Sequence, residues 1–430
     1  MNFLPNIIFA IILFLGIGFF ARNISKLKRN IFLGKDVDLS GDSKIRWKNM
    51  ARIALGQSKM VRRPIAGILH IIVYVGFVII NIEVLEIIID GLFGTHRILS
   101  GIGSLYGVLI GTFEILATLV FVAVVIFWFR RNVVKIKRFL NSEMKGWPKL
   151  DGNLILYFEI VLMGLFILMN ATDVEFQSMN SGNVISQFFA PLFEGYNVHL
   201  IERVAWWMHI VGILIFLNYL YYSKHLHILL AFPNTYFGSV KPKGQFNNLE
   251  AVTNEVKLMM DPNIDPFAAT DDDGSVPDKF GASDVQDLNK IQLLNAYTCT
   301  ECGRCTSECP ANQTGKKLSP RKIMMDTRDR LVEVGHNIDA NNGEFIPDGK
   351  QLLGDYITNE ELWACTSCNA CVEACPISID PLSIILEMRR YLVMEQSAAP
   401  MELNTMMSNI ENNGAPWPYN QMDRLNWKNE

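Results

Sequence analysis

Two stretches of the chain repeat one spacing of cysteines, and this repeat constrains the fold more than any other feature. Residues 299–310 and 365–376 both follow the pattern Cys-x2-Cys-x2-Cys-x3-Cys-Pro. Three cysteines at these intervals can close round one face of an iron–sulfur cubane, and in two-cluster proteins the fourth cysteine of each run reaches the other cluster. The repeat therefore predicts two 4Fe–4S clusters.

The eight cysteines of the chain all lie in these runs. The expected ligands of the first cluster are Cys299, Cys302, Cys305 and Cys375, and those of the second are Cys365, Cys368, Cys371 and Cys309. The alternative is two structural zinc sites, which usually combine Cys-x2-Cys pairs. No cysteine is left for a disulfide, which indicates a reducing compartment.

The apolar residues are concentrated in the first half of the chain, although 50% of all 430 residues are hydrophobic. Stretches long enough to cross a bilayer lie at residues 3–20, 65–89, 104–129, 153–171 and 204–222. The first has no basic segment before it and no cleavage pattern after it, so we expect a retained span. The net charge of -4 and the lack of a basic, aromatic-rich patch argue against nucleic acid as a partner.

The distribution of lysine and arginine predicts the orientation of these spans. Residues 22–63 and 130–149, which follow the first and third spans, are rich in both, whereas the other two loops hold only Arg97 and Arg203. Basic loops stay in the cytoplasm. We therefore expect the N-terminus outside the cytoplasmic membrane of a bacterium or archaeon, and both cysteine runs in the cytoplasm.

Two histidines lie inside the expected spans, His70 in the second and His209 in the fifth. They are either packed, hydrogen-bonded residues or axial ligands of haem, and the neighbouring cluster motifs favour a haem between them. Without a Cys-x2-Cys-His run the haem would be noncovalent, of the b type. At 1.5 Å per residue the two match in depth only if a span boundary shifts; if both boundaries hold, they do not share an iron.

Two further histidines, His225 and His227, follow the fifth span. If the helix continues, His227 lies five turns beyond His209 on the same face, and His225 points elsewhere. His227 is then either a ligand of a second haem near the cytoplasm or a solvated interfacial residue. The second span has no second histidine, so that haem would be five-coordinate, take Met60, or be absent.

Acidic residues gather toward the outer side of the second and third spans, with His96 in the loop between them. They are Glu83, Glu86, Asp90 and Glu114. A quinone headgroup needs hydrogen-bonding and proton-exchanging partners at the membrane edge, and these residues are candidates for that role. The alternative is that they are ordinary interface residues.

The rest of the chain divides into three expected parts. Residues 231–289 form an acidic linker with Asp261, Asp265, Asp271, Asp272, Asp273 and Asp278. Residues 290–395 form an all-α two-cluster ferredoxin domain, with helices predicted at 321–334, 350–364 and 384–394 and a turn at Asn342-Gly343. Residues 396–430 are a tail that we expect to dock a partner. The predicted fold class is all-α throughout.

Two families resemble parts of this sequence. Residues 1–230 resemble the membrane cytochrome b subunits of the respiratory nitrate reductase gamma type and of membrane heterodisulfide reductases, which have five spans. In this resemblance His70 and His209 match a haem-ligand pair, and Ser223–His227 looks like the closing motif. Residues 290–430 resemble the two-cluster subunit of heterodisulfide reductase and the iron–sulfur subunits of glycolate and glycerol-phosphate dehydrogenases. There, a segment like 412–427 leads into a domain with paired Cys-Cys-Gly runs.

These observations predict an electron-transfer subunit of a quinone-linked oxidoreductase complex. It would link the menaquinone pool, through haem b and two 4Fe–4S clusters, to a Cys-Cys-Gly-domain subunit expected on a separate chain, because no further cysteine follows Cys375. Gly101-x-Gly103 opens a span and is a poor nucleotide-binding match. The alternatives are a self-contained membrane iron–sulfur reductase of the heterodisulfide type and a haem-free membrane anchor or redox sensor.

Overall fold

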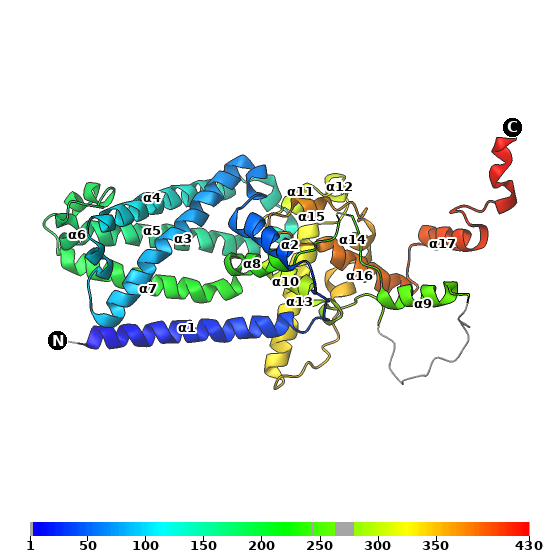
Figure 1. Cartoon of the computed structure of the whole chain (residues 1–430), viewed down its shortest axis with the longest axis horizontal. Helices are drawn as coiled ribbons and strands as arrows, with labels where there is room; N and C mark the ends of the chain where they lie inside the picture. The colour runs from blue at the N-terminus through cyan, green and yellow to red at the C-terminus, as the bar shows by residue number, and fades with distance from the viewer. Residues whose placement is uncertain (1–2, 243, 263–278, 430) are drawn as a thin grey trace.

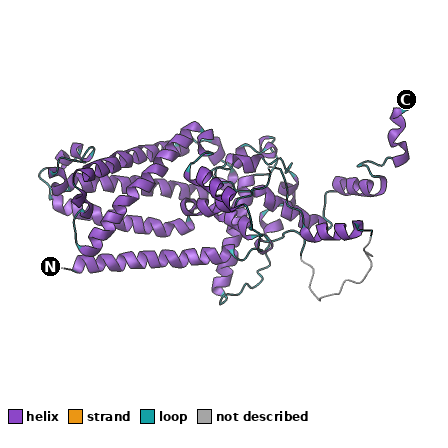
Figure 2. Ribbon diagram, viewed as in Figure 1, coloured by secondary structure: helices purple, strands orange, loops and turns teal. Residues whose placement is uncertain are grey.

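The computed structural model describes residues 3–242, 244–262 and 279–429, and within these ranges the chain is helical, without a named β-strand (Figure 2). The predicted all-α class is confirmed. Long helices form a bundle, and a group of shorter helices packs against one end of it (Figure 1).

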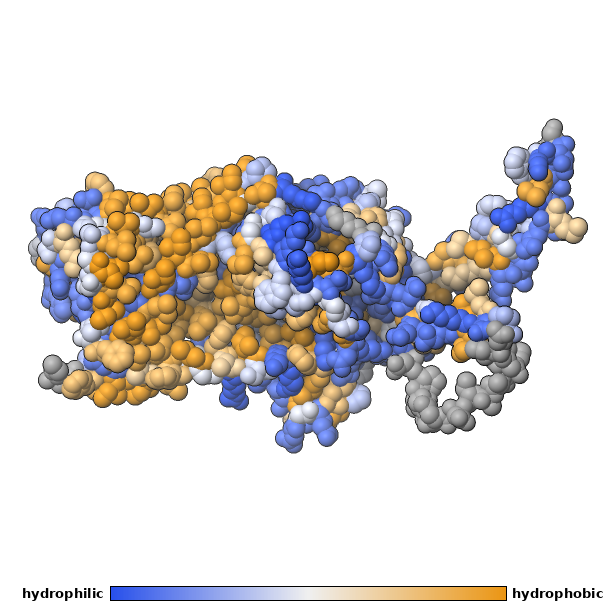
Figure 3. Space-filling view, in the orientation of Figure 1, coloured by the Kyte–Doolittle hydropathy of each residue, from blue (hydrophilic) through white to orange (hydrophobic). Residues whose placement is uncertain are grey.

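The bundle consists of five long apolar helices, each able to cross a membrane. They are α1 (Leu4–Ile31), α3 (Pro64–Phe93), α4 (Ser104–Asn132), α5 (Trp147–Thr172) and α7 (Val198–Tyr219). A proline occupies the first turn of α1, α3 and α5, where its missing N–H costs no hydrogen bond. Apolar side chains cover most of the face of the bundle that Figure 3 shows. The chain is therefore a multi-pass membrane protein, and the five predicted spans overlap these helices.

Short elements close both ends of the bundle. Near the shorter helices lie α2 (Ser43–Met50), a π-helical turn (Ala51–Leu55), α8 (His227–Phe237) and 3-10 turns at Met60–Arg62, Lys137–Phe139, Ser142–Met144, Leu220–Tyr222 and Lys224–Leu226. At the far end lie α6 (Val174–Ser178) and 3-10 turns at Ile98–Ile102, Ser186–Phe188 and Ala190–Phe193. The basic loops thus meet the shorter helices.

The cysteine-bearing domain is built round one long helix, α13 (Pro320–Ala340). The other helices of the domain are α10 (Lys290–Thr298), α11 (Arg304–Ser307), α12 (Pro310–Gln313), α14 (Asn359–Trp363), α15 (Ala370–Ala374) and α16 (Pro381–Met394), with a 3-10 turn at Val285–Asp287. The predicted turn at Asn342-Gly343 is confirmed by two positive φ angles. The helix predicted at 350–364 is wrong: Leu353 and Gly354 have non-helical angles, and only α14 is regular.

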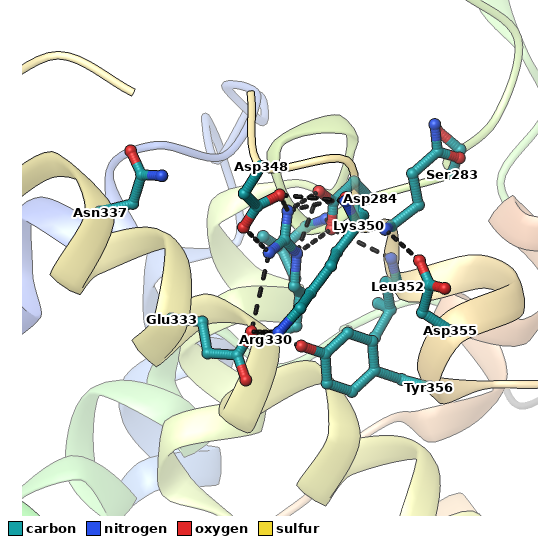
Figure 4. A network of polar contacts seen from close by, with 12 residues as sticks. Ser283, Asp284, Arg330, Glu333, Asn337, Asp348, Lys350, Leu352, Asp355 and Tyr356 are labelled. Carbon is teal, nitrogen blue, oxygen red and sulfur yellow. Dashed lines mark hydrogen bonds and ion pairs between the residues drawn. The ribbon is translucent and has the colours of Figure 1, made fainter. Parts of the chain in front are cut away.

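The segment between the two cysteine runs is fastened by a buried arginine (Figure 4). The guanidinium of Arg330 donates to Asp284 (2.8 Å) and Asp348 (2.6 Å) and to the carbonyl of Lys350 (2.9 Å). Its side chain is fully buried. Asp284 precedes the first cysteine run, and Asp348 and Lys350 lie in the loop after α13. This arginine therefore holds both of these segments to the domain core.

The domain packs directly on the bundle rather than hanging from it. One buried apolar cluster includes Leu27 and Phe216 of the bundle together with Leu293 of the domain. Asn30 donates to the hydroxyl of Tyr297 (2.9 Å), and both groups are buried. The bundle and the domain therefore share a core, which fixes their relative position.

The helix of the fifth span does not continue to His227, so the condition under which His227 would share a face with His209 is not met. Ser223 is extended, and α8 begins a new helix at His227. The break is stabilised by Asp151 of α5, which accepts hydrogen bonds from Tyr219 (2.5 Å), Ser223 (2.6 Å) and the Lys224 backbone (3.2 Å). The direction of the His227 side chain therefore does not follow from counting helical turns from His209.

The segment expected to be a linker is partly ordered. α8 falls partly within it, and its Asn234 donates to the carbonyl of Ile377 (2.8 Å). α9 (Glu250–Met260) has no buried residue. Asp261 lies just beyond α9; Asp265, Asp271, Asp272, Asp273 and Asp278 lie outside the described residues. The tail contains α17 (Met401–Asn413) and a 3-10 helix (Gln421–Lys428), which project away from the bundle (Figure 1).

Candidate functional site

One pocket of the domain is lined by four cysteines from both runs. Cys299, Cys302 and Cys305 of the first run meet Cys375 of the second, with Met324 among the apolar side chains around them. This is the set expected for the first cluster. Cys375, the fourth cysteine of the second run, lies with the first three cysteines of the first run, as the spacing predicts.

The backbone of each run is bent by left-handed residues at matching positions. Glu301 and Gly303 in the first run correspond to Ser367 and Asn369 in the second, and all four have positive φ. A side chain at Gly303 would collide with the Arg321 guanidinium. These bends turn backbone N–H groups toward sulfur: Ser367 donates to Cys365 (3.4 Å). Such hydrogen bonds stabilise thiolates and tune a cluster.

The second group of cysteines lies beside the first. Burial is the main cause of the raised pKa of the Cys365 thiol, and the nearby Cys309 and Cys368 raise this pKa further. Cys371 is likewise close to Cys365 and Cys309. The expected second set, Cys365, Cys368, Cys371 and Cys309, is therefore gathered in one region.

The cysteine spacing along both runs is that of cluster ligands. Within the described residues no three histidine, cysteine or acidic side chains converge as ligands of a single ion. A tetrahedral zinc ion would require that convergence, whereas a cubane places each thiolate on a different iron. Burial raises the pKa of Cys299 to about 12 and that of Cys375 to about 11, so cluster assembly must release protons.

Three histidines meet at the end of the bundle beneath the domain. The ring centres of His70 and His227 are 6.4 Å apart, and those of His225 and His227 are 5.4 Å apart. Two imidazoles on opposite sides of one iron would have ring centres roughly 6 Å apart, since a metal–imidazole bond is about 2 Å. The separation of the His70 and His227 rings is close to that value.

The ring nitrogens of this pair also suit ligation. His227 Nδ1 donates to the Lys224 carbonyl (3.1 Å), which fixes the tautomer and leaves Nε2 free to bind a metal. His70 Nδ1 is buried and has no hydrogen-bond partner among the described residues. Burial lowers the pKa of His227, which favours the neutral ring that a metal ligand needs.

His209 lies apart from this group. It is buried in α7 beside the Phe166 ring, with ring centres 6.1 Å apart. No ring contact joins it to His70 in the described structure, and its Nδ1 has no partner there. The expected pair of His70 and His209 stays a prediction, while the structure places the His70 ring beside that of His227. Met60, the other expected ligand, contacts the Arg304 guanidinium through its sulfur (3.2 Å).

One acidic residue near these histidines was not singled out from the sequence. Glu159 of α5 is buried, and its Oε1 lies 4.0 Å from His225 Nε2. A lone carboxylate in the apolar run Leu154–Leu165 was the available signal, because charges inside membrane helices are costly and seldom without a role.

The opposite end of the bundle contains a polar pocket that gathers most of the acidic candidates. Its lining includes Glu83, Glu86, Asp90 and His96, together with Arg97 and Asp173. Arg97 donates to Asp173 (2.8 Å), and a hydrogen bond from His96 to Asp173 raises the pKa of His96. Glu83 is 2% exposed, and its Oε2 has no partner among the described residues.

Glu114 is the candidate that this pocket does not include. It is fully buried and accepts hydrogen bonds from the Asn170 side chain (3.0 Å) and the Ile185 backbone (2.7 Å). Both of its carboxylate oxygens are engaged, so its contacts are those of a structural residue.

Comparison with known proteins supports the cluster domain directly. Residues 298–379 match the family described as "4Fe-4S dicluster domain". The predicted dicluster domain is thereby confirmed, while the assignment of each cysteine to a cluster stays a prediction. No solved structure matches the chain.

Curated relatives match nearly the whole chain. The probable iron–sulfur-binding oxidoreductase FadF of Bacillus subtilis is 29% identical over 89% of this chain and 54% of its own length. The EtfAB:quinone oxidoreductase of Syntrophomonas wolfei is 26% identical over 88% of this chain and 53% of its own length. The chain thus spans about half the length of these two relatives.

The second half also has shorter relatives. One of them, from the ferredoxin/F420H2-dependent CoB-CoM heterodisulfide reductase of Methanosarcina acetivorans, is 34% identical over 26% of this chain and 56% of its own length. The expected similarity to heterodisulfide reductase is confirmed, whereas that to a nitrate reductase gamma-type cytochrome stays a prediction. Together with the five long apolar helices, these similarities characterise the chain as a membrane-associated iron–sulfur electron-transfer protein.

Proposed function

We propose that this protein transfers electrons between the quinone pool and an oxidoreductase unit in the cytoplasm, by way of a membrane histidine site and two 4Fe–4S clusters. The observation that carries the proposal is the position of the first cysteine run. It is held against the bundle end that contains His70, His225 and His227, because Lys224, next to His225, is hydrogen-bonded to Glu301 of that run.

The histidine site fits a b-type haem held by His70 and His227. Their ring separation, the orientation of His227 by the Lys224 carbonyl and the unpartnered Nδ1 of His70 support this pair. A haem bound there would supply a one-electron carrier inside the membrane. The Phe216 ring, 5.4 Å from that of His225, helps to keep this region apolar. His209 is the remaining candidate ligand, for a second haem deeper in the bundle.

The quinone headgroup fits the polar pocket at the far end. Glu83 can accept a proton there because its Oε2 has no hydrogen-bond partner among the described residues, and Glu86 accepts a hydrogen bond from the Tyr106 hydroxyl (3.2 Å). In α3 His70 precedes Glu83 by thirteen residues, or about 20 Å of helix. That length favours a further carrier between the two sites, and His209 is placed to hold it.

The orientation and the partner are part of the same proposal. The basic loops favour a cytoplasmic location for the cluster domain and an outside N-terminus. Relatives named as iron–sulfur oxidoreductase, EtfAB:quinone oxidoreductase and heterodisulfide reductase subunit support a redox partner. A Cys-Cys-Gly-type oxidoreductase unit beyond these 430 residues is the partner that we propose, contacted through the tail at 396–430.

The test measures iron, sulfide and haem in the purified full chain and records a dithionite-reduced minus oxidised spectrum. We expect a b-type α-band from which His70→Ala and His227→Ala each remove the same part and His209→Ala does not remove that part, with iron and sulfide retained in all three. If His209→Ala removes the part that His70→Ala removes and His227→Ala does not, the pair expected from the sequence is the right one. Absence of the band from the unaltered chain would leave a haem-free anchor or sensor.

A further inference from the structure

One lysine connects the histidine site to the first cysteine run. The backbone carbonyl of Lys224 accepts the hydrogen bond from His227 Nδ1, while its ammonium donates to Glu301 and to the carbonyl of Pro148 (2.7 Å). The Lys224 side chain is 9% exposed and that of Glu301 is 2% exposed. Through its backbone and its side chain, this one residue therefore connects the membrane bundle to the cluster-binding loop.

Glu301 is placed where its charge acts on the first cluster. It lies between Cys299 and Cys302 with a positive φ, and its backbone N–H is hydrogen-bonded to the Cys299 sulfur. One carboxylate oxygen accepts from Lys224 and the other from Arg328 (2.8 Å). Both cations are largely buried, so water screens these charges little.

The second run lacks this arrangement. Ser367 occupies the position of Glu301, with the same left-handed backbone and the same kind of N–H to sulfur contact, but with a neutral side chain. The guanidinium of Arg389 donates to the Ser367 hydroxyl (3.4 Å) and to the carbonyls of Leu362 and Cys365, so a cation lies near this loop but no carboxylate stands at the position of Glu301. The two cluster loops therefore share a backbone and differ in buried charge.

We propose that Lys224 and Glu301 are positioning residues that hold the first cluster against the histidine site and set its reduction potential apart from that of the second cluster. The inference rests on the proposed function, which makes these clusters electron carriers. Reduction adds one negative charge to a cluster, so a buried ammonium nearby favours it and a buried carboxylate opposes it. The two residues act on the potential with opposite sign.

The test uses the full chain and the variants Lys224→Met, Glu301→Gln and the double variant. Iron and sulfide are measured first, and each cluster is then titrated potentiometrically with detection by electron paramagnetic resonance. We expect Lys224→Met to lower and Glu301→Gln to raise the potential of one cluster, each by about tenfold in the reduction equilibrium, or about 59 mV for one electron. The double variant should lie between them, and the other cluster should not move.

Two controls separate charge from folding. Lys224→Arg keeps the cation and should keep the potential, and Lys317→Met removes a lysine whose pair with Glu360 is exposed and should change nothing. If Lys224→Met does not assemble its clusters, Glu301→Gln still tests the sign, because the inference predicts a rise in the potential of one cluster.

Shifts of the same sign, equal shifts of both clusters, or no shift would overturn the inference. Failure of the proposed function has a different signature: the unaltered chain would lack the haem band while its cluster potentials still responded to these variants. The same spectra therefore tell the two failures apart.

Discussion

The two cysteine runs have the same ligand spacing but differ in burial and in the residues around them. Of the expected ligands of the first cluster, Cys299 and Cys375 are buried, and Arg304 of the first run reaches the carbonyl of Lys59 (3.1 Å) at the start of the membrane bundle. In the second run Cys368 is exposed, and Ala370 takes the place of Arg304. The same ligand spacing therefore serves one cluster enclosed at the membrane end and one open to the surroundings.

The difference indicates a direction in space for electron transfer. Burial among fixed charges suits a carrier that exchanges electrons with a site inside the same chain. Exposure of Cys368 suits one that exchanges them with another protein unit, because a partner can approach closely. The cysteines determine where the clusters bind, and the residues between the cysteines determine what surrounds each cluster.

The largest expected effect is the loss of one cluster and not the other. Cys375→Ser removes a second-run cysteine that lines the first-run pocket. We expect iron to fall from about eight to about four atoms per chain, with the loss of the more enclosed cluster. Iron and sulfide analysis, with electron paramagnetic resonance of the reduced protein, measures this.

Cys309→Ser is the reciprocal variant and should remove the second cluster instead. The Glu301→Gln shift identifies which signal belongs to the first cluster. If Cys375→Ser removed the second-run signal and Cys309→Ser the first-run signal, each run would hold its own cluster and the crossing of the fourth cysteine would be refuted.

The next largest effect is expected in the segment that joins the two cysteine runs. Arg330→Met leaves Asp284 and Asp348 facing each other without a cation, which should cost about 3–5 kcal/mol. The melting temperature of the full chain should fall. Lys317→Met is the matched control, since its ion pair with Glu360 is exposed, and its melting temperature should not change. Equal melting temperatures for both variants would show that the Arg330 network does not hold the joining segment.

The smallest effect concerns the exposed ion pairs between the bundle and the runs. Arg62 pairs with Glu373 of the second run (2.5 Å), and the two side chains are 55% and 35% exposed. Arg62→Ala should cost about 0–1 kcal/mol and lose its effect at high salt, because exposed pairs are screened. Thermal unfolding at low and high salt measures this. A large, salt-independent loss would mean that the second run depends on the bundle as much as the first does.

The parts of the fold that depend on local pattern could be predicted from the sequence. The five spans follow from runs of apolar residues, and the gathering of Cys375 with the first run follows from cluster geometry. The break before His227 could not be predicted, because Asp151, which stabilises it, lies in a different helix. That break brings His227 near His70.

Long-range charge pairs could not be predicted either. Nothing in the spacing of Lys224 or Glu301 indicates that they meet, since 77 residues separate them along the chain. Glu159 was detectable as a lone carboxylate in an apolar run, but its neighbour His225 was not. Predicting such contacts requires the relative position of the bundle and the domain, which their shared core determines.

The central claim is that the clusters exchange electrons with quinone through the histidine site. The most direct measurement reduces the full chain with dithionite, removes the excess and follows cluster reoxidation after menaquinone is added, with ferricyanide as a direct oxidant for comparison. The account predicts that His70→Ala and His227→Ala slow reoxidation by menaquinone at least about tenfold and leave reoxidation by ferricyanide unchanged. Equal rates with menaquinone in the variants and the unaltered chain would contradict it.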